Sequence, residues 1–254
     1  MNRIDKINFI RKKLRSSKHS IGTWIQIPHS SIAEILGKSG YDWVAVDLEH
    51  GSIGIAQLPD LFRAIELGGT LPIVRLAEGR IKDCKQALDA GSGGVIVPMV
   101  TSASQLQKIR DGCCWPPSGT RSVGFSRANL FGEKFEEYYE EAQSPLLVAQ
   151  IESFQGVENL ESILKIDGLD AILIGPYDLS ASMELTGQFE HPKFVEAMKH
   201  ILEVCQRSNF PSGIHVVNPD PRELKLRVDE GHVFIAYSID AVFLNKFSKL
   251  PNLF

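Results

Sequence analysis

The feature that most constrains this chain is an eightfold alternation between short apolar runs and stretches with helical periodicity. Residues 43–46 and 71–74 are continuously apolar, as expected of strands buried on both faces. Between them, apolar residues recur every three or four positions across residues 57–67, and Gly68 and Gly69 then end the predicted helix. Strands that alternate with helices run parallel, because each helix carries the chain back to the edge where the previous strand began.

The number of these units predicts the fold. The predicted strands cover residues 21–27, 43–47, 71–75, 94–98, 146–152, 171–174, 212–216 and 232–238. Eight consecutive βα units with no linker between halves predict one α/β domain, residues 1–254, closed into a modified (β/α)₈ TIM barrel. A doubly wound open sheet is the alternative. Its dinucleotide fingerprint is missing, since the glycine-rich residues 91–94 precede a strand instead of opening a helix.

Three regions lie outside the regular alternation. Residues 1–20 predict an amphipathic helix, whose apolar residues facing the fold are Ile4, Ile7, Phe9, Ile10 and Leu14. Residues 111–144 form a connection of a length that usually serves function or an interface. That segment and the predicted C-terminal helix at residues 243–250 are apolar enough for burial against another copy of the chain, so we expect the terminal helices to take part in a homo-oligomer.

Composition and cysteine usage exclude several classes of function. The chain has 27 Lys and Arg against 31 Asp and Glu, which is no electrostatic footprint for nucleic acid. No apolar run approaches the roughly 18 residues that a membrane span needs. The four cysteines, Cys84, Cys113, Cys114 and Cys205, lack metal-finger spacing and are expected to be reduced. We therefore expect a cytoplasmic protein that binds neither nucleic acid nor membranes; a transit peptide within residues 1–20 is the less favoured alternative.

The ends of the predicted strands carry a set of polar residues that a barrel would bring together. These are Asp47, Glu49 and His50 after the second strand, Arg75 after the third, Gln150 and Glu152 at the fifth, and Asp178 after the sixth. In a parallel barrel all these ends meet at one face. Two carboxylates suit a hard cation such as Mg²⁺, a guanidinium suits a substrate carboxylate, and an imidazole exchanges protons near neutral pH.

Simpler structural explanations stay open for each of these residues. Arg75 could form a salt bridge with Glu49, while Glu152 and Asp178 could cap the helices that follow them. Asp89, two residues before a helix-ending glycine, is expected at the surface from the pattern alone. The joint occurrence of the polar set favours a functional site over these separate explanations.

Six motifs, taken in order, resemble one known family. They are Asp47-Leu48-Glu49-His50-Gly51, Pro72-Ile73-Val74-Arg75, Leu88-Asp89-Ala90-Gly91, Val95-Ile96-Val97-Pro98-Met99-Val100, Gln150-Ile151-Glu152 and Gly175-Pro176-Tyr177-Asp178-Leu179-Ser180. Over about residues 22–244 the chain is similar to the class II, metal-dependent pyruvate aldolases of the 4-hydroxy-2-oxoheptanedioate aldolase family. The resemblance implies a modified barrel, a hexamer, and a divalent cation, Mg²⁺ or Mn²⁺, with Co²⁺ and Zn²⁺ as alternatives.

The same resemblance implies a reaction and a role for each matching residue. A 4-hydroxy-2-oxo acid, such as 4-hydroxy-2-oxoheptanedioate or a 2-keto-3-deoxy sugar acid, is cleaved to pyruvate and an aldehyde. The catalytic residues would be His50 as the base, Arg75 as the stabiliser of the transition state, Asp47, and Asp89, which raises the basicity of His50. Glu152 and Asp178 would bind the metal. Arg75, Gln150, Gly175, Pro176, Tyr177 and Asp178 would bind substrate, and Trp24, expected at the barrel mouth unless it is a core residue, would shape the aldehyde pocket.

Departures from the family pattern leave the substrate range open. Ser122 and Glu184 stand where relatives usually carry glycine, and Tyr177 is bulkier than the small residue common at its position. We expect an enolate stabilised by metal charge and Arg75, since no lysine stands at a strand end to form a Schiff base. The alternatives are another metal-dependent lyase on this barrel, such as an acyl-CoA lyase or a 2-oxo acid decarboxylase, and a catalytically silent binding protein.

Overall fold

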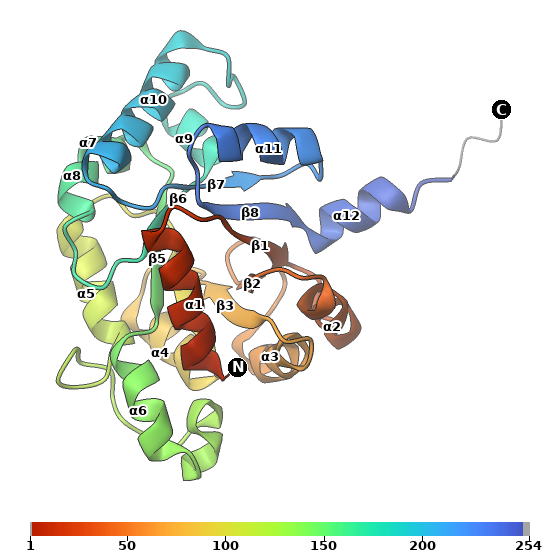
Figure 1. The fold of residues 1–254 in the computed structure, drawn as a ribbon, viewed down its shortest axis with the longest axis vertical. Coiled ribbons are helices and arrows are strands. Elements are labelled where there is room, and N and C mark those ends of the chain that lie inside the picture. Colours follow the sequence, from red (N-terminus) through yellow and green to blue (C-terminus); the bar gives the residue numbers. More distant parts are fainter. Residues whose placement is uncertain (1, 251–254) are drawn as a thin grey trace.

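Eight parallel strands close into a barrel in the computed structural model, which describes residues 2–250 (Figure 1). The strands are β1 (Ser20–Ile25), β2 (Trp43–Asp47), β3 (Leu71–Arg75), β4 (Gly94–Val97), β5 (Leu146–Ile151), β6 (Ala171–Ile174), β7 (Gly213–Val216) and β8 (Phe234–Ile239). Each pairs with its sequence neighbours, and β8 closes on β1. The predicted (β/α)₈ barrel is confirmed. Residue 1 and residues 251–254, the ends of the predicted 1–254 domain, lie outside the described part of the chain.

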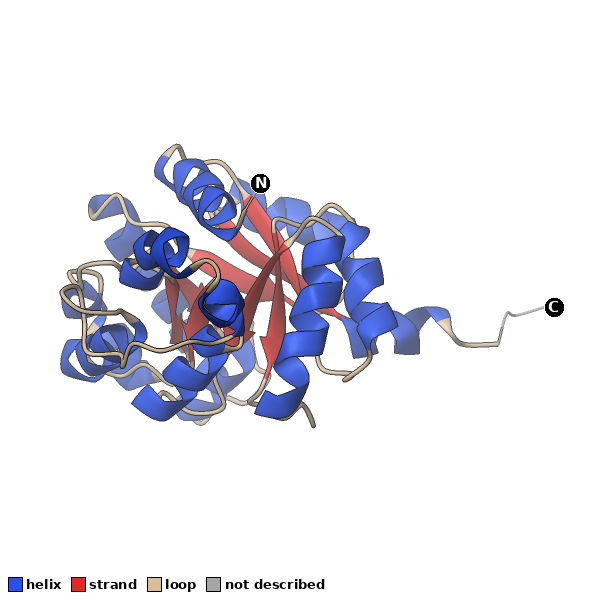
Figure 2. Cartoon of the chain, turned by 90° about the horizontal axis from the view of Figure 1, so that it is seen from below, coloured by secondary structure: helices blue, strands red, loops and turns tan. Residues whose placement is uncertain are grey.

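Helices surround the strands, as Figure 2 shows. They are α1 (Arg3–Arg15), α2 (Ser30–Lys38), α3 (Leu58–Leu67), α4 (Ile81–Asp89), α5 (Ala103–Cys113), α6 (Phe135–Gln143), α7 (Phe154–Glu158), α8 (Leu160–Ile163), α9 (Pro176–Ser182), α10 (Pro192–Arg207), α11 (Pro221–Asp229) and α12 (Asp240–Phe247), with short 3₁₀ helices η1 (Ile55–Gln57) and η2 (Arg127–Gly132). The irregular segment predicted at residues 111–144 thus contains η2 and α6. Between β5 and β6 the chain forms two short helices, α7 and α8.

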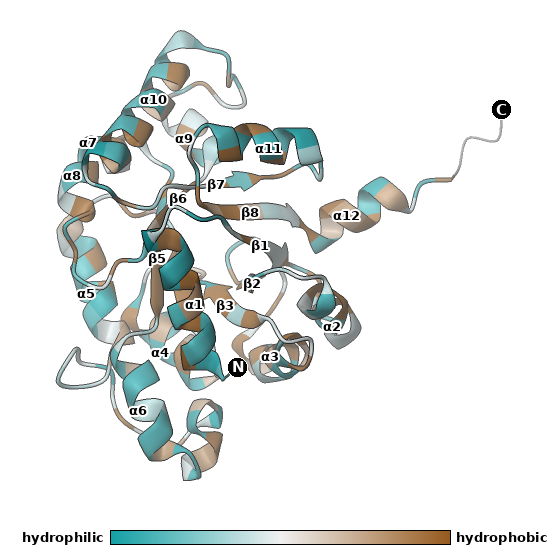
Figure 3. Cartoon of the chain, in the orientation of Figure 1, coloured by the Kyte–Doolittle hydropathy of each residue, from teal (hydrophilic) through white to brown (hydrophobic). Residues whose placement is uncertain are grey.

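Helix α1 crosses the end of the barrel where the strands begin (Figure 1). Its apolar face is buried through Ile7, Ile10 and Leu14, and Figure 3 shows apolar residues along one side of the helix. Phe9 was predicted to face the fold, and this prediction is wrong. At 100° per residue Phe9 lies on the opposite side from Ile7, where it is 45% exposed and its ring contacts the ammonium group of Lys13.

The barrel has two apolar layers. Inward-pointing side chains fill its interior, where Trp43 stacks on Phe234 with ring centroids 4.5 Å apart. Outward-pointing residues of the same strands pack against the surrounding helices. Gly22 is required opposite Trp43, because a Cβ atom there would lie 2.0 Å from the indole ring. The interior is therefore a packed core, and polar chemistry is confined to its ends.

Helix α12 extends away from the barrel body (Figures 1 and 2). Leu244, Phe247 and Leu250 on and after this helix are exposed. None of the helices within residues 2–250 combines the length and apolar character needed to cross a membrane.

Candidate active site

The pairing of β2 with β3 places Asp47 directly beside Arg75 at the carboxyl ends of the strands. The guanidinium donates from Nε to Asp47 Oδ1 at 2.8 Å and from Nη2 to Oδ2 at 2.6 Å, and both side chains are buried. Burial alone would raise the pKa of Asp47, but the hydrogen bonds and charge of Arg75 outweigh it and lower the pKa. Asp47 is therefore an ionised partner that fixes the position of Arg75.

The turn after β2 is organised by the same carboxylate. Asp47 Oδ1 accepts hydrogen bonds from the backbone N–H groups of Glu49, at 3.0 Å, and His50, at 3.3 Å. Glu49 Oε2 lies 3.3 Å from Arg75 Nη1 and 3.8 Å from His50 Nε2. The salt bridge between Arg75 and Glu49 that the sequence left open is thus present. The imidazole of His50 is 54% exposed, so its second face is open to a ligand.

Trp24 lies beneath Arg75, inside the barrel. The guanidinium carbon of Arg75 stands 4.6 Å from the centroid of the indole, which is 1% exposed. Of the two positions that the sequence left open for Trp24, the mouth and the core, the structure shows the core, where its side chain points inward and packs against Trp43 and His215, with centroids 6.3 and 5.7 Å away. Burial, followed by the charge of Arg75, lowers the pKa of His215 to about 3. A neutral aromatic floor therefore supports Arg75.

Glu152 follows β5 and is 1% exposed. Its Oε1 accepts the backbone N–H of Met99 at 2.6 Å, and its Oε2 accepts from the side-chain amide of Gln150. Burial raises the pKa of Glu152 to about 7, and the negative charges of Glu49 and Asp178 add to that increase. The carboxylates of Glu49, Glu152 and Asp178, which follow β2, β5 and β6, therefore repel one another at this rim.

The segment after β6 completes the rim. A Cβ atom at Gly175 would lie 2.8 Å from Glu152 Oε2 and 3.2 Å from the Gln150 amide nitrogen, so only glycine leaves room for both. Pro176 begins α9, and Asp178 stands exposed in its first turn. The exposed ring of Tyr177 packs edge-on against Phe189, with centroids 5.0 Å apart.

The donor set at this rim fits a divalent cation. Glu152 and Asp178 supply the hard oxygen ligands that Mg²⁺ or Mn²⁺ takes from proteins. Burial raises the pKa of Glu49, and the neighbouring charges of Asp47 and Asp178 add to the increase despite Arg75. Within residues 2–250, the buried Oε1 of Gln150 has no hydrogen-bond partner. A cation here would relieve the repulsion among the carboxylates.

Asp89 does not join this rim. It ends α4, and the chain enters β4 five residues later, so Asp89 lies near the strand starts at the opposite end of the barrel from His50. Its Oδ1 is 3.2 Å from Nη1 of Arg121, whose side chain is fully buried against Trp115 and Tyr138. The expectation that Asp89 acts on His50 is therefore wrong within one chain. Its side chain is 30% exposed, so Asp89 is half-buried and lies between the surface position that the pattern predicted and the core.

Sequence reasoning missed several contributors to the site. Gln26 donates to Asp47 Oδ2 at 2.8 Å, and its place just after β1 was the available signal. Nothing in the sequence indicated the N–H of Met99 or the ring of His215. The residue type alone shows neither the direction of a backbone N–H group nor whether a histidine is buried and neutral. Of the departures noted above, Ser122 is exposed and Glu184 has a φ of 60°, the left-handed region that favours glycine.

Comparisons with known proteins found relatives in sequence and in fold. The family model described as HpcH/HpaI aldolase/citrate lyase matches residues 20–245. A hydroxypyruvate/pyruvate aldolase from Roseobacter denitrificans is 35% identical over 242 residues, which are 94% of this chain and 93% of the relative. A 2-keto-3-deoxy-L-rhamnonate aldolase from Klebsiella pneumoniae is 34% identical over 238 residues, which are 92% of this chain and 88% of that relative. A solved Burkholderia cenocepacia protein of the matched family superposes with a TM-score of 0.88 at 28% identity, covering 95% of this chain and 96% of that one.

Proposed function

This chain belongs to the HpcH/HpaI aldolase/citrate lyase family, and from that premise we propose that it cleaves a 4-hydroxy-2-oxo acid into pyruvate and an aldehyde. It is a carbon–carbon lyase of the class II, metal-dependent type. The candidate substrates are 4-hydroxy-2-oxoheptanedioate and 2-keto-3-deoxy sugar acids, the latter because of the rhamnonate aldolase relative. The observation that carries the proposal is the gathering of Arg75, His50, Glu152 and Asp178 at one rim.

Glu152 and Asp178 would hold the divalent cation, for which we propose Mg²⁺ or Mn²⁺. When bound, the cation supplies positive charge to the oxygens of the 2-oxo acid. The Gln150 amide donates to Glu152 and so fixes the direction of that carboxylate. Gly175 leaves the space in which the carboxylate and the amide meet.

Arg75 would bind the substrate oxygens on which charge develops as the bond breaks. Its guanidinium is held by Asp47 and Glu49 and rests on Trp24, so it needs no reorganisation during the reaction. Arg75 therefore favours the transition state over the ground state, which is the condition for raising kcat.

His50 would exchange the proton of the 4-hydroxyl group, directly or through one water. In cleavage, the hydroxyl loses its proton to the imidazole, the bond between C3 and C4 breaks, and the aldehyde departs. The electron pair of that bond remains on the pyruvate fragment as an enolate, which then takes a proton at C3. The exposure of His50 allows this exchange, and its backbone is held by Asp47.

Pyruvate release from 4-hydroxy-2-oxo acids tests the proposal, with lactate dehydrogenase and NADH as the detector. We expect EDTA to abolish release and Mg²⁺ or Mn²⁺ to restore it. His50→Ala should lower turnover and leave metal affinity nearly unchanged. Cleavage that survives chelation, or equal loss of turnover and metal affinity in His50→Ala, would contradict the assigned roles. A screen of aldehydes with pyruvate and Mn²⁺ would identify the second product.

We also propose that the chain forms a homo-oligomer, with a hexamer as the expected state. Exposed apolar residues support this on α12, at Leu244 and Phe247, and in the 111–144 segment, at Phe125 and Phe131. Asp89 could raise the basicity of His50 only in such an assembly, on the His50 of another copy. Light scattering of the purified protein measures the oligomeric state, and a monomer would contradict both statements.

A cytoplasmic location is proposed from the thiols. Cys84, Cys113, Cys114 and Cys205 are all free and buried, which fits a reducing compartment.

A further inference from the structure

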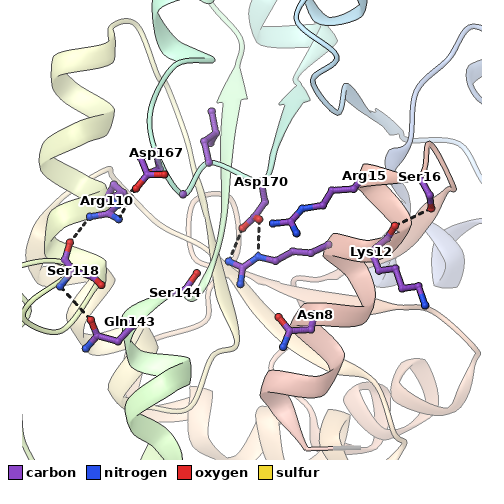
Figure 4. A pocket seen from close by; sticks show the side chains of 13 residues that line it. Asn8, Lys12, Arg15, Ser16, Arg110, Ser118, Gln143, Ser144, Asp167 and Asp170 are labelled. Carbon is purple, nitrogen blue, oxygen red and sulfur yellow. Dashed lines mark hydrogen bonds and ion pairs between the residues drawn. The ribbon is translucent and has the colours of Figure 1, made fainter.

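A basic cavity lies at the end of the barrel opposite the proposed active site. It has a volume of about 850 Å³ and is bounded by α1, the end of α5 and the loop after it, the end of α6, and the turn that leads into β6 (Figure 4). Ser144 and Asp170 stand just before β5 and β6, which places the cavity at the strand starts. It is larger than the cavity of about 660 Å³ between α10 and α11.

The charged groups around this cavity are mainly cationic. Four of the lining side chains are positive, namely Arg11, Lys12, Arg15 and Arg110, and two are negative, namely Asp167 and Asp170. The chain as a whole has a formal net charge of −4. The excess of positive charge is therefore local, and it would concentrate anions at this end of the barrel.

Two of the cations are fixed rather than mobile. Arg11 forms a bidentate pair with Asp170, at 2.7 and 3.0 Å, and only 11% of its side chain is exposed. Arg110 donates to the backbone oxygens of Ser118 and Asp167 and forms long ion pairs with Asp111, at 3.4 Å, and Asp167, at 3.5 Å. These contacts engage its N–H donors and offset part of its charge, so Arg110 adds positive charge at the edge of the cavity and leaves direct contact with an anion to another group.

Arg15 supplies the group available to a ligand. Figure 4 shows it extending from α1 across the cavity toward Asp170. Within residues 2–250, no ion pair or hydrogen bond engages its guanidinium. Cations at the end of a helix also offset the helix dipole, which would explain Arg15 alone. That effect does not explain why Arg110, from a different helix, borders the same cavity.

We propose that this cavity binds a small phosphomonoester that also carries hydroxyl groups, such as a sugar phosphate. Arg15 would meet the phosphate, because a guanidinium group matches phosphate oxygens in pairs, and Arg110 would add positive charge beside it. The side chains of Ser144 and Asn8 offer neutral hydrogen-bonding groups for the rest of the ligand. Asp167, which is 97% exposed, can accept from a ligand hydroxyl but would repel a second acidic group. A polycarboxylate therefore fits the cavity less well than one dianionic group on a hydroxylated body.

Isothermal titration calorimetry of the full-length enzyme tests the ligand class. Glucose 6-phosphate should bind with a Kd below 1 mM, inorganic phosphate more weakly, and glucose without measurable heat. Arg15→Gln should weaken glucose 6-phosphate binding at least tenfold. The matched control is Arg63→Gln on α3, whose side chain is also exposed, and it should leave binding unchanged. Tighter binding of citrate than of glucose 6-phosphate, or equal losses in the two variants, would overturn the proposal.

Hydrogen exchange locates the ligand without relying on a variant. Glucose 6-phosphate should slow exchange at residues 8–16 and 166–170, which border the cavity. Protection at residues 47–50 or 150–152 instead would place the anion at the opposite rim and overturn the proposal. No protection anywhere would also overturn it. None of these measurements depends on aldolase activity, so the cavity and the proposed reaction can fail separately.

Discussion

The two ends of the barrel carry similar buried charges but balance them differently. Where the strands begin, Asp42 meets Lys13 at 2.7 Å and Asp170 meets Arg11 at 2.7 Å. Where the strands end, Glu49, Glu152 and Asp178 lie together, and the nearby Arg75 is shared by Asp47 and Glu49, so the carboxylates outnumber it. Matched pairs hold elements together, whereas unmatched carboxylates shift pKa values and attract cations. If the proposed site is correct, stability and chemistry lie at opposite ends of one scaffold.

The largest expected effect comes from replacing a buried glutamate by glutamine, in one variant at the strand ends and in another at the strand starts. Glu152→Gln should abolish aldol cleavage, because it removes a proposed metal ligand. It should leave the melting temperature of the metal-free protein unchanged or higher, because it also removes one of three mutually repelling carboxylates. Pyruvate release and thermal denaturation without added metal check the two halves.

The matched control for Glu152→Gln is Glu141→Gln at the strand starts. Glu141 pairs with Arg3 at 2.8 Å and 8% of its side chain is exposed. This variant should melt at a lower temperature and cleave substrate normally. Two variants that lose activity and stability in the same proportion would break the comparison between the ends.

Asp47→Asn should have the second-largest effect. Asp47 lies at the end with the proposed active site, but it is in a buried ion pair, as the carboxylates at the strand starts are. Its removal leaves the buried Arg75 with Glu49 alone, and breaking a buried ion pair costs on the order of 3–5 kcal/mol. We therefore expect losses in both the free energy of unfolding in urea and kcat/KM. Asp42→Asn, whose pair with Lys13 is more exposed, should cost less and spare kcat/KM. A stable Asp47→Asn enzyme with normal turnover would show that Arg75 needs no fixed partner.

The sequence predicted the barrel and the gathering of polar side chains at one of its ends, because both follow from local patterns. Continuous apolar runs identify buried parallel strands, and parallel closure then brings His50, Arg75 and Glu152 to one face whatever their separation in the chain. The prediction for Phe9 was wrong for a local reason. It was based on the apolar residue type and did not consider which side of the helix Phe9 occupies.

Other features depend on contacts that no local pattern records. Helix α6 has few apolar residues, and it is anchored by the ion pair of Glu141 with Arg3, 138 positions away. Trp24 is a core residue because its side chain points inward, and Asp89 lies at the far end because α4 runs back along the barrel. Which end a residue occupies is decided by the direction of its element, and sequence motifs do not carry that direction.

The pH dependence of stability should arise partly from the strand starts. His232 is fully buried beside the hydroxyl of Ser212, 2.9 Å away, and burial, with Arg227 nearby, lowers its pKa from 6.5 to about 4. Between pH 4 and pH 6.5, His232 therefore binds a proton in the unfolded chain but not in the folded chain. Stability is full above pH 6.5 and falls as the pH drops toward 4, by about 2 kcal/mol between pH 6.5 and pH 5.

Urea unfolding at pH 7 and pH 5 measures this contribution from His232. His232→Asn should lose less stability between the two pH values than the parent chain does, even though it is less stable at both. The same slope in His232→Asn as in the parent would remove His232 as the source.

The smallest expected effect concerns backbone strain at the two ends. Glu184, after α9 at the catalytic end, has a φ of 60°, and Asn209, after α10 at the strand starts, has a φ of 48°. A left-handed conformation costs most residues about 1–2 kcal/mol, asparagine less, and glycine nothing, although glycine loses roughly 0.5–1 kcal/mol in chain entropy. Glu184→Gly should therefore raise stability by about 0.5–1 kcal/mol, a shift in Tm of about 1–4 °C for a chain of this size. Asn209→Gly should change the Tm little or lower it. Because the family resemblance implies glycine at the position of Glu184, the kinetics of the same variant are informative. If Glu184→Gly raises Tm and changes KM for the aldehyde, the strain is connected to the substrate site; if only Tm changes, it is a structural departure.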